Sequence, residues 1–356
     1  MSAAAPREPQ RSSAGGRAAR ARLDALWQRG RAFLGAEYAI LGGAMTWVSE
    51  RNLVSALSNA GGFGVIACGA MTPDLLSAEI EATYRLTERP FGVNLITVHP
   101  ELDALIDVCR DHRVSHVILA GGLPPGPAIA RIKESGAKVL CFAPTLAVAR
   151  RLVRLGADAI VIEGAEAGGH VGPVATSVLA QEILPNLDQV PVFIAGGIGR
   201  GDAILGYLEL GASGCQLGTR FVCATESIAH ADFKRAFIRA SARDAVTTVQ
   251  IDPDFPVTPV RALQNKGTQA FVEAQKRAIA KVRAGELAQD EAQLEIEHFW
   301  AGALRRAVID GDIESGSLMA GQSVGMVVRE QPTAEIIGEL VDQALAAIEA
   351  RASSGG

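Results

Sequence analysis

The sequence has little that would support a disulfide-rich, metal-centred or membrane-spanning protein. Its 356 residues include five cysteines, with no Cys-x-x-Cys pair and no spacing typical of zinc ligands. This odd number argues against a disulfide framework and favours a reducing, cytoplasmic location. No apolar stretch reaches the roughly 18 residues that a membrane-spanning helix needs. We therefore expect a cytoplasmic protein without a membrane segment or a metal site.

An excess of positive charge is also absent. The formal net charge is −5 and no long basic run occurs, so a nucleic-acid partner is not indicated. The first 31 residues are different in composition, because they contain seven arginines against two acidic residues. We expect residues 1–36 to form a disordered basic tail that continues into a short helix.

From Tyr38 onward, short apolar runs alternate with helical patterns at intervals of roughly 25 residues, as in α/β folds. One of these helices is expected over Ser49–Gly61, with Ser49 as its N-cap. The predicted strands are Tyr38–Gly43, Phe63–Gly69, Phe91–Ile96, His116–Gly122, Lys138–Pro144, Ala159–Ile162, Pro191–Ile198 and Gly214–Val222. Eight such units are what closure of a (β/α)₈ TIM barrel needs. A doubly wound sheet is the alternative, and it would require the strand order to reverse halfway.

The regular alternation stops after the eighth strand. Residues 223–311 contain helical patterns over Ala231–Ser241 and Lys266–Asp310, without further strand-long apolar runs. We interpret this segment as a helical insertion or lid. The barrel itself is predicted to comprise residues 37–222 and 312–356.

The end of the sixth strand carries the strongest indication of chemistry. Within residues 163–172 come four glycines, two carboxylates and His170. Glycines let a backbone lie against a flat ligand, and the carboxyl ends of parallel strands are where α/β folds place their active sites. Glu163 and Glu166 could form an acid–base pair. A satisfied polar residue in a glycine-rich loop is the alternative interpretation of His170.

Two later strand ends indicate a phosphate site. They are Ala195-Gly-Gly-Ile-Gly199 and Gln216-Leu-Gly-Thr-Arg220. In barrels, the loops after strands seven and eight frequently bind phosphate through backbone N–H groups. Thr219 could add a hydroxyl donor and Arg220 a charge. Each glycine pair by itself could also be a tight turn.

Five short motifs occur in one order, and together they resemble the FMN-dependent nitronate monooxygenase (2-nitropropane dioxygenase) family over about residues 38–328. The motifs are Ser58–Gly64, Phe91–Asn94, Glu166–His170, Ala195–Ile198 and Gln216–Thr219. The resemblance implies a flavoprotein barrel in which His170 stands beside the flavin as a base or an orienting group. The FMN-binding residues that it implies are Ala44, Met45, Asn94, Glu163, Gly168, Gly169, Gly196, Gly197, Gln216, Leu217, Gly218 and Thr219.

The resemblance slightly favours oxidation of alkyl nitronates with O₂. The family also includes FMN-dependent enoyl-acyl-carrier-protein reductases of the second class, which use NADH and an enoyl thioester, and NADH:quinone reductases. Two features look like these reductases: Glu163, where many nitronate oxygenases look to have glutamine, and the segment Gly316–Gly325. From the residues alone, a non-redox isomerase or lyase that grips a substrate phosphate stays open. A homodimer is one option for the assembly.

Overall fold

The computed structural model describes residues 14–252, 255 and 258–354. Eight parallel strands form its main sheet, in the order β1-β9-β8-β6-β5-β4-β3-β2. These strands are β1 (Ile40–Gly42), β2 (Val65–Ala67), β3 (Gly92–Ile96), β4 (His116–Ala120), β5 (Lys138–Phe142), β6 (Ala159–Glu163), β8 (Val192–Ala195) and β9 (Gly214–Leu217). The strand order follows the chain, so the sheet has no reversal of the kind a doubly wound fold requires.

The sheet closes on itself between its first and last strands. Leu41 forms a parallel bridge with Phe63, just before β2. The Phe63 N–H donates to the Ile40 carbonyl and the Gly42 N–H donates to the Phe63 carbonyl, each at 2.9 Å. The predicted (β/α)₈ barrel is therefore confirmed.

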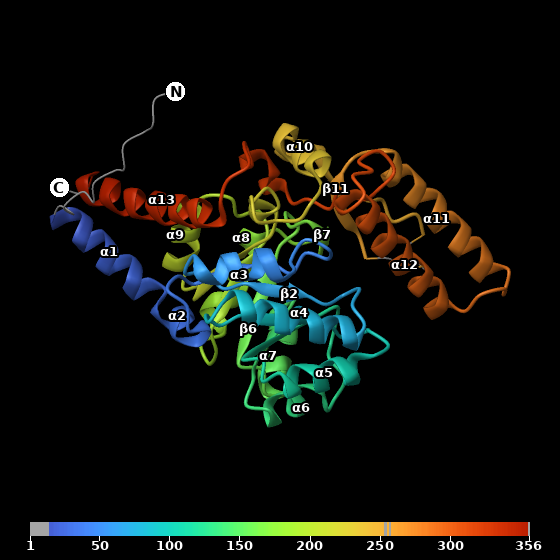
Figure 1. Cartoon of the computed structure of the whole chain (residues 1–356), viewed down its shortest axis with the longest axis horizontal. Helices are drawn as coiled ribbons and strands as arrows, with labels where there is room; N and C mark the ends of the chain where they lie inside the picture. Colours follow the sequence, from blue (N-terminus) through green and yellow to red (C-terminus); the bar gives the residue numbers. More distant parts are fainter. Residues whose placement is uncertain (1–13, 253–254, 256–257, 355–356) are drawn as a thin grey trace.

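Seven helices follow barrel strands and cover the outside of the sheet (Figure 1). They are α3 (Arg51–Asn59), α4 (Pro73–Leu86), α5 (Leu102–Asp111), α6 (Ala128–Glu134), α7 (Leu146–Arg154), α8 (Thr176–Ile183) and α9 (Gly201–Glu209). The C-terminal helix α13 (Thr333–Ser354) packs on α9, α3 and the N-terminal helix α1 (Ala14–Leu26). Their apolar faces form one continuous core with the outer face of the sheet.

The predicted N-cap of the first barrel helix was wrong. The helix begins at Arg51 with Glu50 as its cap, and the Glu50 side chain accepts hydrogen bonds from the N–H groups of Asn52 and Leu53. Ser49 instead holds the loop after β1: its hydroxyl accepts from the Met45 N–H (3.0 Å) and donates to the Gly43 carbonyl (2.8 Å). A hydroxyl forms either bond equally well, so the sequence does not distinguish the two arrangements.

A short helix closes the amino-terminal end of the barrel. This helix, α2 (Gln28–Leu34), places Leu34 in a cluster with inward-facing residues of the sheet. His116, at the start of β4, contacts the ring of Phe33 edge-on, with 5.3 Å between ring centroids. The helices α1 and α2 account for residues 14–34 of the expected tail, and residues 1–13 lie outside the described residues.

Residues 223–311 contain helices and also two strands that the sequence did not predict. The helices are α10 (Ala231–Arg239), α11 (Lys266–Arg283) and α12 (Gln289–Val308), and the last two lie beside the barrel (Figure 1). They share an apolar cluster that includes Phe271 and Trp300. The strands β10 (Ala245–Thr247) and β11 (Val260–Leu263) form a small antiparallel sheet with β7 (Gly169–His170). The proposed division of the chain into barrel and insertion stays a prediction.

No helix among the described residues is both long and apolar enough to cross a membrane.

Candidate active site

The loops after β1 and β9 meet at the carboxyl end of the barrel. The Gly43 N–H donates to the Leu217 carbonyl at 2.8 Å. A methyl group placed on Gly218 would lie 3.5 Å from the sulfur of Met45, an ordinary van der Waals contact. Two neighbouring loops therefore contain four of the predicted residues, Ala44, Met45, Leu217 and Gly218. The Ser49 hydroxyl holds the first of these loops through its hydrogen bonds to Met45 and Gly43.

The loop after β6 packs against the loop after β8. Gly196 and Gly197 adopt positive φ values of 97° and 72°, which favour glycine. A Cβ on Gly197 would lie 3.0 Å from the Cβ of Glu166. The Glu166 carboxylate accepts hydrogen bonds from the N–H (2.8 Å) and hydroxyl (2.9 Å) of Thr176, at the start of α8. Glu166 thus caps a helix, and its suggested acid–base pairing with Glu163 stays a prediction.

A late segment of the chain completes this end of the barrel. Gly321 lies so close to Gly168 that a Cβ on Gly168 would be 2.5 Å from the Gly321 nitrogen. Only glycine fits at position 168, because any side chain there would collide with the backbone of Ala320 and Gly321. The Gly321 N–H donates to the hydroxyl of Thr219 at 2.9 Å, and the hydroxyl hydrogen of Thr219 remains for another acceptor.

Arg220 does not join Thr219 in this site. Its guanidinium donates to Gln331 at 3.2 Å and forms an ion pair with Glu339 at 2.9 Å, and its side chain is 2% exposed. The expected phosphate contact from Arg220 was therefore wrong. A charged side chain pairs with the nearest opposite charge when buried, and the position of Glu339 on α13 is not visible in the sequence.

Three predicted polar residues face the inside of the barrel. Glu163 and Gln216 lie in one row across β6, β8 and β9, because both pair in register with Ala195. Paired positions in parallel strands share a face, and Ala195 belongs to the interior apolar cluster. Asn94 pairs in register with Ile118 of the same cluster. The Asn94 amide donates to the Ile118 carbonyl at 3.3 Å, the structural hydrogen bond that its buried position requires.

Glu163 has unusual electrostatics. It lies at the end of β6, and among the described residues its carboxyl group makes no hydrogen bond or ion pair. The side chain is partly buried, and the surrounding protein is dense enough that burial raises the pKa of Glu163 to about 8. The group is therefore mainly the neutral acid at pH 7.

His170 is exposed and lies on β7, where the barrel meets the insertion. Its register partner on β11 is Val260, and Gly169 pairs with Arg261. The Val171 N–H donates to the Pro259 carbonyl at 2.9 Å. A two-residue strand leaves no periodic signal, so the pairing of the histidine loop with residues more than 80 positions later could not be predicted from sequence patterns.

Arg261 is a neighbour of this loop that the sequence analysis did not single out, and Met319 is one that it named only within the segment Gly316–Gly325. Arg261 donates to the Ala165 carbonyl at 3.0 Å and to the Ala245 carbonyl at 2.5 Å, which ties the loop after β6 to β10. Met319 forms a bridge with Ala262 on β11, and its sulfur would lie 3.5 Å from a Cβ on Gly169. Arg261 lies outside every motif named from the sequence, and the pairing of β11 with β7 and with Met319 brings these residues together.

Two surface hollows of the described chain lie away from this end of the barrel. One of about 510 Å³ lies between α1 and α13, and one of about 650 Å³ lies beside α3. Neither is lined by a predicted site residue. In the described part of the chain, no group of three or more His, Cys, Asp or Glu residues is placed to hold a metal ion.

Comparison with known proteins identifies relatives over nearly the whole chain. A (3aS,4S,5R,7aS)-5-hydroxy-7a-methyl-1-oxo-octahydro-1H-indene-4-carboxyl-CoA dehydrogenase of Mycobacterium tuberculosis is 30% identical, over 88% of this chain and 94% of that protein. A nitronate monooxygenase of Paraburkholderia phytofirmans is 28% identical, over 89% of this chain and 94% of that protein.

Solved structures also match nearly the whole chain. FabK from Thermotoga maritima has a TM-score of 0.82 and 35% identity, and the match covers 92% of this chain and 98% of FabK. A nitroalkane oxidase from Streptomyces ansochromogenes has a TM-score of 0.75 and 27% identity, with 90% and 99% of the two chains covered. The nitronate monooxygenase family profile matches residues 28–105 and 98–343. The chain therefore belongs to the nitronate monooxygenase family of oxidoreductases.

Proposed function

We propose that this enzyme binds FMN across the carboxyl end of its barrel and uses it for oxidation and reduction. The observation that carries the proposal is the meeting of four strand-end loops and residues 319–321 at the end of the barrel where Glu163 ends β6, with no hydrogen-bond partner for its carboxyl group among the described residues. Backbone N–H groups and small residues suit a phosphate and a flat ring. These residues therefore fit a flavin mononucleotide.

The proposed contacts follow from where each residue lies. We assign the phosphate to Gly196, Gly197, Gly218 and Thr219, because the Thr219 hydroxyl retains a hydrogen to donate. We assign the ring to the inward-facing polar side chains and the two loops beside them. The residues proposed for the ring are Ala44, Met45, Asn94, Glu163, Gly168, Gly169, Gln216 and Leu217.

For the substrate, we propose a thioester-linked acyl group. The sequence alone slightly favours alkyl nitronates, but the comparisons support the thioester class. FabK at 35% identity and the CoA dehydrogenase at 30% exceed the nitroalkane oxidase at 27% and the nitronate monooxygenase at 28%. FabK is an enoyl-acyl-carrier-protein reductase of the second class, the reductase group that the sequence motifs also resemble.

Oxidation of alkyl nitronates with O₂ is the second candidate, and the family match favours it. Both reactions involve proton exchange at a carbon next to an electron-withdrawing group. Reduction of an enoyl thioester adds a proton to the carbon next to the carbonyl, and a neutral nitroalkane loses a proton to become the nitronate. FMN, when bound, supplies the electron transfer. We propose that His170 exchanges a proton with such a carbon or orients the substrate, since an imidazole can both donate and accept a proton.

Anaerobic stopped-flow spectra would separate these functions. If the thioester proposal is correct, NADH bleaches the flavin within a few turnovers and a crotonyl thioester reoxidises it. If nitronate oxidation is correct, propionate-3-nitronate reduces the flavin without NADH, and O₂ restores the oxidised spectrum. A protein that retains no flavin after reconstitution would contradict both, and FAD in place of FMN would contradict the cofactor assignment.

A further inference from the structure

Glu163 is an ionisable residue at a position where no neighbouring group of the described chain stabilises a negative charge. Its carboxyl group faces the barrel interior in a row with Ala195 and Gln216. Among the described residues, no side chain or backbone group donates a hydrogen bond to it, and no cation lies within ion-pair distance. An enclosed carboxylate without such partners is costly, whereas a neutral acid is tolerated and offers one O–H donor.

The groups around Glu163 do not supply a compensating charge. Cys141 of β5, the strand beside β6, and Cys215 of β9, the strand beyond β8, are buried in the outer core, and burial raises the pKa of both thiols. Glu166 is bound to Thr176, and Arg261 donates to the carbonyls of Ala165 and Ala245. His170 is exposed on β7. The charged side chains of the packed helices α7 and α8 are exposed; these are Arg150, Arg151, Arg154 and Glu182.

Resting on the proposed function, we infer that Glu163 meets FMN as a neutral carboxylic acid that donates a hydrogen bond to an acceptor atom of the flavin ring. A flat ring over the end of β6 would remove the remaining water from this carboxyl group. Loss of water disfavours the carboxylate further, so the cofactor selects the protonated form. Ionisation of Glu163 then weakens FMN binding, and the cofactor affinity depends on pH through this one residue.

The test compares FMN retention by the wild-type holoprotein and by Glu163→Gln, which keeps a neutral donor without an ionisable group. Both proteins are diluted at pH 7 and at pH 9, and released FMN is measured by its fluorescence. With an acid that titrates near pH 8, the dissociation constant of the wild type rises about tenfold over this range relative to the variant. Ionisations of FMN itself affect both proteins equally and cancel in the ratio.

Two additional measurements make the inference sharper. Calorimetry of FMN binding at pH 9 in buffers of different ionisation enthalpy should show uptake of about one proton by the wild type and none by Glu163→Gln. Glu163→Leu, which is neutral but has no donor, should bind FMN about three- to tenfold more weakly than Glu163→Gln at pH 7. Equal affinity of these two variants would contradict the hydrogen bond.

The inference is overturned if the ratio of dissociation constants stays flat or falls between pH 7 and pH 9, since the carboxylate would then bind FMN as well as the acid does. If neither the wild type nor Glu163→Gln retains FMN at any pH, the proposed function itself is overturned. The two failures are therefore distinguishable.

Discussion

Each end of the barrel contains a titratable side chain, but only at the amino-terminal end does the described chain provide it with hydrogen-bond partners. At the amino-terminal end, His116 is 3% exposed and burial lowers its pKa to about 4. Its Nε2 donates to the Phe33 carbonyl at 2.9 Å, and its Nδ1 accepts from the Ser115 hydroxyl at 2.9 Å. At the carboxyl end, burial raises the pKa of Glu163 to about 8, and the described chain offers it no partner.

This difference distinguishes the end of the barrel that is closed by packing from the end that we propose binds a ligand. Both groups are neutral at pH 7, and the protein completes the hydrogen bonds of His116 with its own atoms. A neutral group whose bonds are complete serves packing, while one whose bonds are left open favours a ligand. The same contrast is expected in barrel enzymes, where the carboxyl ends of the strands carry the chemistry and the opposite end carries stability.

The largest effect is expected from His170 at the carboxyl end. His170→Ala should lower turnover on a neutral nitroalkane or thioester by about 10²–10⁴-fold, because a positioned proton-exchanging group is lost. FMN content and the melting temperature should stay unchanged. On a pre-ionised nitronate the loss should be much smaller. Equal losses on both substrates would leave His170 an orienting group, and loss of the flavin would make it a structural support.

The amino-terminal end should respond to pH through stability instead. The folded state holds His116 neutral down to about pH 4, while the unfolded chain takes up a proton below about pH 6.5. The unfolded state therefore binds more protons in this window, and the free energy of unfolding should fall by about 3 kcal/mol as the pH drops through it. Urea unfolding at pH 7 and pH 4.5 measures the change. His116→Gln should flatten this pH dependence without altering FMN affinity.

A smaller effect is expected at the phosphate position. Thr219→Ala removes a hydroxyl that accepts from Gly321 and would donate to the phosphate. Loss of a charge-assisted hydrogen bond of about 1.5–3 kcal/mol should weaken FMN binding roughly tenfold to a hundredfold. Thr219→Ser keeps the hydroxyl and serves as the matched control. An unchanged dissociation constant for the alanine variant would place the phosphate elsewhere.

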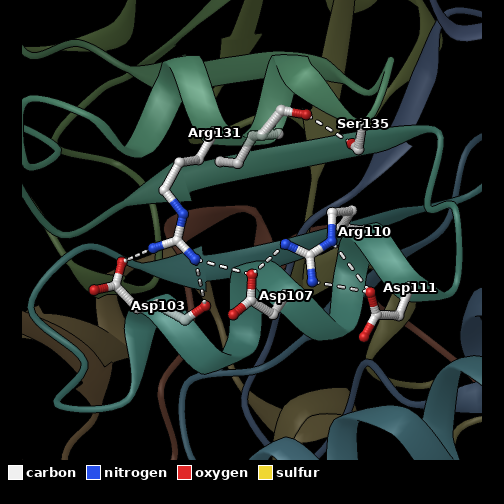
Figure 2. Close-up of polar contacts among 7 residues, drawn as sticks. Asp103, Asp107, Arg110, Asp111, Arg131 and Ser135 are labelled. Carbon is white, nitrogen blue, oxygen red and sulfur yellow. Dashed lines mark hydrogen bonds and ion pairs between the residues drawn. The ribbon is translucent and has the colours of Figure 1, made fainter.

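The smallest effect is expected on the outer face of the barrel. There Arg131 of α6 reaches across to Asp103 and Asp107 of α5 (Figure 2), and its bond to Asp107 is 2.9 Å. These ion pairs are partly exposed, so Arg131→Ala should cost about 0.2–1 kcal/mol of stability. The cost should shrink in high salt, and turnover should not change. A loss of turnover would show that α5 couples the outer face of the barrel to the active site.

The barrel could be predicted from the sequence because its strands are buried on both faces. Runs such as Ala159–Ile162 are apolar without alternation, and each is followed by a helical pattern and a glycine-bearing turn. The glycine motifs at 168–169, 196–197 and 218 also lie where the sequence predicted, at strand ends. In a barrel of parallel strands, all carboxyl ends lie on the same side. Local sequence patterns therefore predict both the strands and the end of the barrel at which the glycine motifs lie.

The tertiary structure alone decided how the polar side chains are used. Arg220 pairs with Glu339, Ser49 holds Met45, and Glu166 caps α8, although each residue had an equally good local alternative. The pairing of β7 with β11 joins segments about 90 residues apart, and neither strand is long enough to show a period. A short polar contact depends on what the fold brings within about 3 Å, and sequence spacing carries no information about that distance.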